Sequence, residues 1–156
     1  SMKFAGLKEE RKPNMLVFKD HSNAELFKIM FKAREILKDG GIFHILGDGY
    51  HGKSSITMDF LGKVRGFRGS FAELGLSTDA AIIPLFITSD NHGKLTYNLQ
   101  DPLDKGSEEL SHQERVEHIV KQYKDLLEQW WKKEPQHINW GFMDKYLRQV
   151  QYQKTE

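Results

Sequence analysis

The segment Gly47–Ser54 constrains the fold more than any other part of this chain. It reads Gly-Asp-Gly-Tyr-His-Gly-Lys-Ser and matches G-x-x-x-x-G-K-[ST], a loop whose backbone amides hold nucleotide phosphates. The strand-like run Ile42–Leu46 precedes it. Such a loop must continue directly into a helix, because the phosphates bind at the helix N-terminus. Residues 55–61 therefore decide between two incompatible interpretations.

The pattern of residues 55–61 favours a strand. Apolar and polar side chains alternate from Ile56 to Phe60, and the β-branched residues in this run prefer extended backbone. Gly62 would also interrupt a helix after about two turns. We therefore expect a glycine-rich hairpin between strands at 42–46 and 56–60. A phosphate loop formed by Gly47–Ser54, in a nucleotide-binding protein, is the alternative.

Composition limits the classes of protein to consider. A chain of 156 residues that is 38% hydrophobic is long enough for one domain with a core. The 23 basic and 22 acidic residues leave a net charge of +1, which argues against a dedicated nucleic-acid binder. The absence of cysteine excludes a thiolate nucleophile. We expect no metal and no cofactor. No apolar run is long enough to span a membrane, so we expect the chain itself to be soluble.

The order of helical and strand patterns predicts an α/β protein with a mixed β-sheet flanked by helices. Residues 1–14 form a loose lead-in, and residues 15–150 form a single domain. Serine followed three residues later by glutamate predicts capping boxes that open helices at Ser22, Ser70 and Ser111. The expected strands cover 15–18, 42–46, 56–60, 80–87 (interrupted by Pro84) and 95–99.

Two helices and several histidines complete this reading. The first helix has an apolar stripe, and the longest helix has another that Pro135 ends. The stripe residues are Leu26, Phe27, Met30, Ala33, Ile36 and Leu37 in the first helix, and Val116, Ile119, Val120, Tyr123, Leu127 and Trp130 in the other. His44 lies in an apolar run, so we expect a buried core histidine. His112 and His118 do not share a helical face, so a metal site there is not expected.

A set of landmarks follows in a fixed order over residues 33–140. A helix stops at Leu37–Gly41, a hydrophobic strand follows, and an acidic residue lies in the glycine turn Asp48–Gly52. A strand ending in Phe and Gly (Met58–Gly62) comes next, then a glycine-rich entry to a helix (Gly66–Leu74). The later landmarks are an apolar strand around Pro84, a long helix, the pair Pro135-Gln136, and Trp140.

In this order the landmarks resemble the C-terminal part of the lysophospholipid and lipid A acyltransferases, closest to the lauroyl/myristoyl branch. The resemblance implies a glycerolipid acyltransferase-like fold, here incomplete. It also implies transfer of a fatty acyl group from a thioester donor to a lipid or lipid A-type hydroxyl. In that family a histidine paired with an acid deprotonates the hydroxyl, without a covalent enzyme intermediate.

The catalytic residues are a departure from the family pattern. The family's His-x4-Asp/Glu motif lies upstream of all these landmarks, whereas three residues rather than four separate His21 from Glu25. We therefore expect the chain to lack this motif, assign no catalytic residue, and expect no acyl transfer by these 156 residues alone. A non-catalytic protein that binds lipid phosphate is a further alternative.

The resemblance assigns substrate contacts instead. Asp48, Gly49 and His51 occupy the place of an acid-Gly-Thr-Arg block that contacts the acceptor's polar head. Other contacts are expected from the basic entry to the helix at residue 70, where cationic side chains adjoin free amides, and from the proline that shapes the pocket. These residues are Arg65, Arg68, Gly69, Ser70 and Pro84. On the residues alone, Arg65 and Arg68 could equally be solvated surface charges.

The resemblance also implies partners. They are an acyl-CoA or acyl-carrier-protein donor, a phosphorylated lipid acceptor, and a membrane reached through a missing N-terminal part. We expect no nucleic-acid partner. The intact protein is expected at the cytoplasmic face of the inner membrane. A fragment should keep an exposed apolar edge, through which a homodimer could form.

Overall fold

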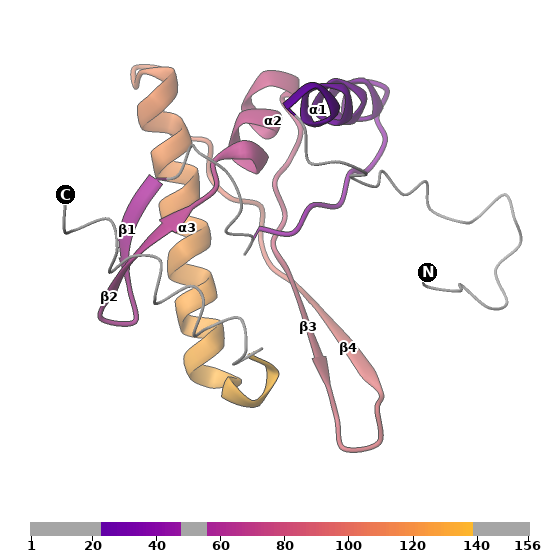
Figure 1. The fold of residues 1–156 in the computed structure, drawn as a ribbon, viewed down its shortest axis with the longest axis vertical. Helices are drawn as coiled ribbons and strands as arrows, with labels where there is room; N and C mark the ends of the chain where they lie inside the picture. The colour runs from indigo at the N-terminus through magenta and orange to yellow at the C-terminus, as the bar shows by residue number, and fades with distance from the viewer. Residues whose placement is uncertain (1–22, 48–55, 139–156) are drawn as a thin grey trace, which may run out of the picture.

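A computed structural model describes residues 23–47 and 56–138 of the chain, with side chains from residue 27 onward. Within them lie three α-helices, four strands and a 3-10 turn (Figure 1). The elements are α1 (Asn23–Lys38), β1 (Ile56–Phe60), β2 (Lys63–Phe67), α2 (Ser70–Thr78), β3 (Leu85–Ser89), β4 (Leu95–Leu99), α3 (His112–Lys133) and η2 (Pro135–His137). The α/β class is confirmed.

The strands of the described residues form two separate antiparallel pairs, β1–β2 and β3–β4. The single mixed sheet expected from the sequence is not seen among them. The expected lead-in at 1–14 and the strand at 15–18 lie outside the described residues.

Helix α1 (Asn23–Lys38) confirms the helix predicted between the cap at Ser22 and the stop at Leu37–Gly41. It ends at Lys38, and the glycines that follow close it: Gly40 has φ of 77°, and the Gly41 amide donates to the Ile36 carbonyl at 2.8 Å. Ala33 is fully buried. The predicted core stripe is wrong at Phe27, which is 76% exposed, because the helix turns this residue away from the rest of the structure. Ser22, the predicted cap, lies outside the described residues.

The predicted buried strand at 42–46 is wrong. The segment is extended, but no backbone hydrogen bond joins it to another described strand, and Ile42 is 93% exposed. Its side chains alternate: Phe43 and Ile45 are half-buried, whereas Ile42, His44 and Leu46 are exposed. The prediction of a buried core histidine at His44 is therefore also wrong. The run is apolar enough for a central strand, but no described strand lies beside it.

The strand expected at 56–60 is confirmed as β1, but its partner is β2 and not the segment 42–46. β1 pairs with β2, from Ile56 opposite Phe67 to Phe60 opposite Lys63. The two-residue turn uses Leu61 and Gly62, with φ of 50° and 73°, as a tight hairpin turn requires. The expected hairpin between 42–46 and 56–60 is therefore wrong, because the neighbouring segment in sequence offers β1 a shorter connection.

Helix α2 begins where expected, but without the predicted capping box. Its N-cap is Gly69, and no side chain makes a cap hydrogen bond there. Ser70 is already the first helical residue, so its hydroxyl is one position too late to accept from the expected amide. The helix ends at Thr78, and its C-cap Asp79 is a left-handed residue with φ of 56°.

The β3–β4 hairpin extends away from the other elements (Figure 1). In its turn, the Asp90 side chain accepts from the amides of His92 and Lys94, each at 2.9 Å. Of the strand expected at 80–87, only the part from Leu85 onward forms a strand, β3, and residues 80–84 are irregular. Upstream of it, Pro84 is buried and isolated bonds hold the chain, from the Gln100 amide to the Pro84 carbonyl and from the Leu103 amide to the Ile82 carbonyl.

Strand β4 confirms the strand expected at 95–99, and its apolar face is exposed. Leu95, Tyr97 and Leu99 are 52%, 61% and 70% exposed. They share one face of the hairpin with Leu85 and Ile87, their cross-strand partners at positions 99 and 97. The opposite face turns Phe86 into the core. This face of the hairpin is an exposed apolar surface, and the expected apolar edge left by a missing part stays a prediction.

Helix α3 is the central support of the structure and confirms its predicted start, stripe and end. The Ser111 hydroxyl accepts from the Glu114 amide at 3.3 Å, and the Glu114 carboxylate accepts from the Ser111 amide at 2.8 Å. Trp131 packs edge-on against Phe60 of β1, and Trp130 stacks on Phe86 of β3. Each hairpin is thus fixed to the same helix by its own aromatic contact. The buried core is Phe60, Phe67, Phe71, Ala72, Phe86, Leu103, Val116, Ile119, Val120 and Leu127.

Candidate functional site

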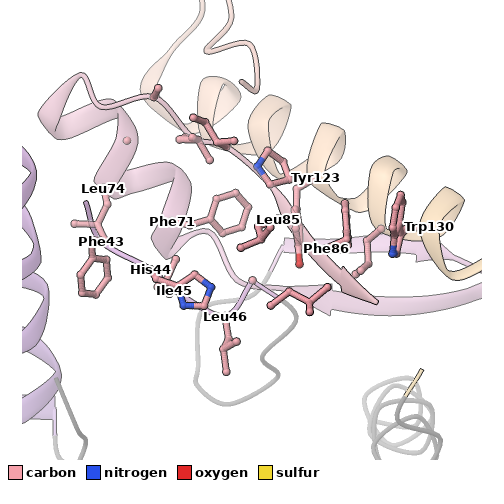
Figure 2. A pocket seen from close by; sticks show the side chains of 18 of the residues that line it. Phe43, His44, Ile45, Leu46, Phe71, Leu74, Leu85, Phe86, Tyr123 and Trp130 are labelled. Carbon is pink, nitrogen blue, oxygen red and sulfur yellow. The ribbon is translucent and has the colours of Figure 1, made fainter. Parts of the chain in front are cut away.

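A pocket of about 330 Å³ lies where several parts of the chain meet, and Leu37 of α1 also borders it. Its walls are the extended segment 43–47, helix α2, the irregular segment 80–84 with the start of β3, and helix α3 (Figure 2). The segment after α1 thus forms one wall of this pocket instead of a strand within a sheet. Half-buried and exposed members of the segment both line it: Phe43, His44, Ile45, Leu46 and Gly47.

Most of the pocket lining is apolar. Phe71 meets Tyr123 edge-on at 5.2 Å between ring centroids, and Trp130 closes the side nearest β3. The polar side chains of the lining are His44 of the segment after α1, Tyr123 with its hydroxyl, Glu134 and His137. His137 and Glu134 line the pocket beyond the end of α3, with 3.8 Å between Nε2 and a carboxylate oxygen, and both are mostly buried. Such a lining accommodates a hydrocarbon group and provides a small number of groups to orient a polar end.

Gly47 is the last described residue before the glycine loop, and it lines the pocket beside Tyr123. A Cβ placed on Gly47 would lie 2.7 Å from the Tyr123 ring, so only glycine allows the backbone to pass so closely. The chain therefore leaves the pocket wall directly into Asp48. Asp48, Gly49 and His51 lie outside the described residues, so their predicted roles stay predictions.

The phosphate-loop alternative requires a helix directly after the loop, and residues 56–60 are strand β1. The sequence match at Gly47–Ser54 is therefore not accompanied by the architecture that nucleotide binding needs. The loop itself lies outside the described residues, apart from Gly47.

Arg65 is the predicted site residue whose environment differs most from a surface charge. It is only 4% exposed, and its guanidinium carbon lies 5.2, 4.7 and 5.6 Å from the ring centroids of Phe60, Phe67 and Trp131. The interpretation as a solvated charge is wrong, because β2 turns this side chain toward α3. Its predicted contact with an anion stays a prediction.

Arg68, Gly69 and Ser70 lie together at the start of α2, and none of them lines the pocket. Arg68 is half-buried, and burial lowers the pKa of its guanidinium from the ordinary value. A Cβ on Gly69 would lie 3.1 Å from Val116 of α3, so glycine brings the two helices together here. Of the predicted site residues that the structure describes, it brings only Pro84 to the pocket.

The sequence reasoning missed the aromatic and polar lining of the pocket. Phe71, Tyr123 and Trp130 carry the helical spacing of core residues, so the pattern gave no sign that they also border a cavity. Glu134 and His137 flank Pro135, and the sequence reasoning treated that proline only as the end of α3. The sequence feature that could have indicated this part of the pocket is the pair Glu134 and His137, which follows Trp130 and Trp131 closely.

A His-x4-Glu spacing that the sequence reasoning overlooked is present at His112 and Glu117, within α3 and not upstream of the landmarks, so the expectation that the chain lacks the family's catalytic motif stays a prediction. The spacing does not make a catalytic pair in this structure. His112 Nε2 lies 2.6 Å from Glu73 of α2 instead, and the Glu117 carboxylate accepts from Gln113 at 2.9 Å. Five residues along a helix place the two side chains about 140° apart. His112 is 60% exposed and does not line the pocket.

Other ionisable groups show no metal-binding arrangement. His118 Nε2 lies 2.8 Å from Asp104, in an exposed pair. Within 23–47 and 56–138, no three His, Asp or Glu side chains are placed to hold a metal ion.

Comparison with known protein families shows which family this chain belongs to. The sequence profile of bacterial lipid A biosynthesis acyltransferases matches residues 8–147, which is most of the chain. The chain belongs to this family. The lipid A acyltransferase resemblance of the landmarks over 33–140 is thereby confirmed, and the acyltransferase class with it.

Searches of curated proteins and of solved structures gave no significant match. In the parts of this family member that the structure describes, no helix combines the length and apolar character needed to cross a bilayer.

Proposed function

We propose that this member of the lipid A acyltransferase family binds the acyl part of a fatty-acyl thioester in its pocket, for transfer to a hydroxyl of a phosphorylated lipid. The donor is an acyl-CoA or an acyl-carrier protein. The observation that carries the proposal is the largely apolar pocket, which Gly47 lines immediately before the predicted acceptor-binding residues Asp48, Gly49 and His51 in the sequence.

The chemistry of the pocket supports an acyl ligand. Burial of a methylene group contributes about 0.8 kcal/mol, so a chain of several methylenes gains affinity mainly by leaving water. Aromatic side chains on α2 and α3 provide much of that apolar surface. The thioester and the acceptor hydroxyl require polar contacts, which Glu134 and His137 on the lining can offer.

The general base is not assigned to His112. It is paired with Glu73 on the exposed surface, away from the pocket lining. We propose that polypeptide outside these 156 residues supplies the histidine and its acidic partner. The chain alone should then bind substrates without turnover.

A pair of matched variants tests the pocket. Leu85 is half-buried and lines it, whereas Leu99, its cross-strand neighbour, is 70% exposed and does not. Leu85→Glu places a charge among apolar walls and should weaken binding of lauroyl-CoA by about tenfold or more, since a charge in an apolar site is costly. Leu99→Glu makes the same change in the same hairpin and should leave the affinity unchanged.

Isothermal titration with lauroyl-CoA, and with CoA as the unacylated control, measures both affinities. Binding of lauroyl-CoA but not CoA is expected for the unsubstituted chain. Equal binding of the two ligands, or equal loss in the two variants, would contradict an acyl pocket. Circular dichroism establishes that Leu85→Glu still folds. If it does not, competition between lauroyl-CoA and dodecanol for the unsubstituted chain decides, since only a shared apolar pocket predicts displacement.

A non-catalytic lipid-phosphate binder stays a second hypothesis. It relies on Arg68 at the start of α2, which lies apart from the pocket lining. The homodimer expected from the sequence also stays a proposal. It is supported by the exposed apolar face of β4.

A further inference from the structure

Helix α1 presents two very different faces. Ala33 is fully buried, and Ile29, Met30, Ile36 and Leu37 are half-buried on the same side. The other side carries Phe27 and Phe31, which are 76% and 65% exposed and lie one turn apart. Two exposed phenylalanines in register are a costly surface unless something covers them.

Basic side chains surround this aromatic pair. Lys28, Lys32, Arg34 and Lys38 are all exposed, and Glu35 is the one acidic residue among the described side chains of the helix. At 100° per residue, Arg34 and Lys38 share the side of the helix that carries the phenylalanines, about one and two turns beyond Phe31. The exposed face of α1 thus combines an aromatic centre with a basic border. The whole chain, by contrast, has a net charge of only +1.

The position of α1 leaves this face accessible. The helix lies at the edge of the described structure, beside α2 and away from α3 and the two hairpins (Figure 1). None of the six exposed residues lines the pocket. The face is therefore separate from the proposed acyl site.

We propose that this α1 face, formed by Phe27, Lys28, Phe31, Lys32, Arg34 and Lys38, docks on an anionic lipid surface. Phenylalanine side chains enter the boundary between headgroups and acyl chains, while lysine and arginine interact with anionic headgroups. A second copy of the same face is a poor partner, because two basic borders would repel each other. The contact would add to any anchor elsewhere and does not depend on the proposed acyl pocket.

Vesicle co-sedimentation tests the proposal with the 156-residue chain. Vesicles of phosphatidylcholine with phosphatidylglycerol present an anionic surface, and vesicles of phosphatidylcholine alone present a neutral one. We expect binding to the anionic vesicles at about 0.1 M salt and little binding at about 1 M, where screening is nearly complete. Phe27→Gln with Phe31→Gln, and separately Lys28→Gln with Lys32→Gln, should each weaken binding by about tenfold or more.

Two control variants make the result specific. Tyr97→Gln with Leu99→Gln removes a similarly exposed apolar pair from β4, and Lys63→Gln with Lys94→Gln removes two exposed lysines elsewhere. Both should bind anionic vesicles as the unsubstituted chain does. All variants change exposed residues, and thermal unfolding confirms that they remain folded.

Several results would overturn the proposal: no binding to anionic vesicles, equal binding to neutral ones, or loss of binding only in the β4 variant. Sedimentation showing a dimer that the phenylalanine variant abolishes would instead assign the face to a second copy. Tight binding of a duplex DNA probe through the same lysines would assign it to nucleic acid. Titration of the phenylalanine variant with lauroyl-CoA separates this test from the pocket, since its affinity should not change.

Discussion

Arg65 shows how a single residue can be misjudged when only its type is known. A basic residue beside Gly66 and close to a helix start reads as surface charge or as an anion contact. In the structure it faces Phe60, Phe67 and Trp131, and is almost inaccessible to water. A buried guanidinium on aromatic faces gains cation–π attraction, about 2 kcal/mol when desolvated. Its methylenes also fill space between the rings.

We therefore expect Arg65→Ala to lower the free energy of unfolding by about 2 kcal/mol or more, by removing both the cation–π contacts and the packing. Urea unfolding followed by circular dichroism measures the change. Lys63→Ala, on the same strand but exposed, should stay within about 0.5 kcal/mol of the parent. Equal effects of the two substitutions would show that the burial of Arg65 contributes nothing to stability.

At the scale of elements, residue patterns predicted helices better than strands. A helix satisfies its own backbone, so signals within one segment placed α3 fully, α1 by its apolar stripe and stop signal, and the start of α2. A strand needs a neighbour, and the pattern of one segment does not name it. The run at 42–46 has the composition of a central strand, yet it lines a pocket, and β1 pairs with β2. The pocket was not predicted for the same reason, since its walls come from segments far apart in sequence.

The two capping boxes expected at Ser70 and Ser111 provide a matched comparison. Only Ser111 forms the reciprocal bonds; at α2 the cap position is Gly69. Ser111→Ala should therefore destabilise the protein by about 1 kcal/mol, the usual contribution of a serine N-cap. Ser70→Ala should cost less than half as much. Thermal unfolding of both variants measures the difference in stability. A larger loss of stability for Ser70→Ala than for Ser111→Ala would indicate that Ser70, and not Gly69, is the N-cap of α2.

At the scale of the whole molecule, acid should destabilise the fold. Hydrogen bonds lower the pKa of several carboxyl groups below their ordinary values: that of Asp79 through Lys105, of Asp104 through His118, of Glu114 through Ser111, and of Glu128 through Lys132. A carboxyl with a lowered pKa holds fewer protons in the folded state. Its contribution is present at neutral pH and is lost as the pH falls through the folded pKa.

We expect the acid-side fall in melting temperature to steepen below about pH 4, where these groups bind protons. Asp104→Asn should make that fall shallower, because the substituted side chain does not titrate. Asp101→Asn, on the preceding exposed loop, serves as the control and should follow the parent curve. Melting temperatures of the three proteins are measured across the acid range. If the pH profile of Asp104→Asn equals that of the parent, Asp104 does not contribute to the acid destabilisation.

The adjacent tryptophans of α3 can serve as intrinsic fluorescence probes of the two hairpins. Trp130 stacks on Phe86 of one hairpin, and Trp131 meets Phe60 of the other. Neighbours in sequence therefore stand in two separate environments, and Trp140 is the third tryptophan of the chain. With Trp140 and one of the pair replaced by phenylalanine, the emission of the remaining indole would follow one hairpin alone. Loosening of β3–β4 could then be timed independently of β1–β2, in the same protein and with no added dye.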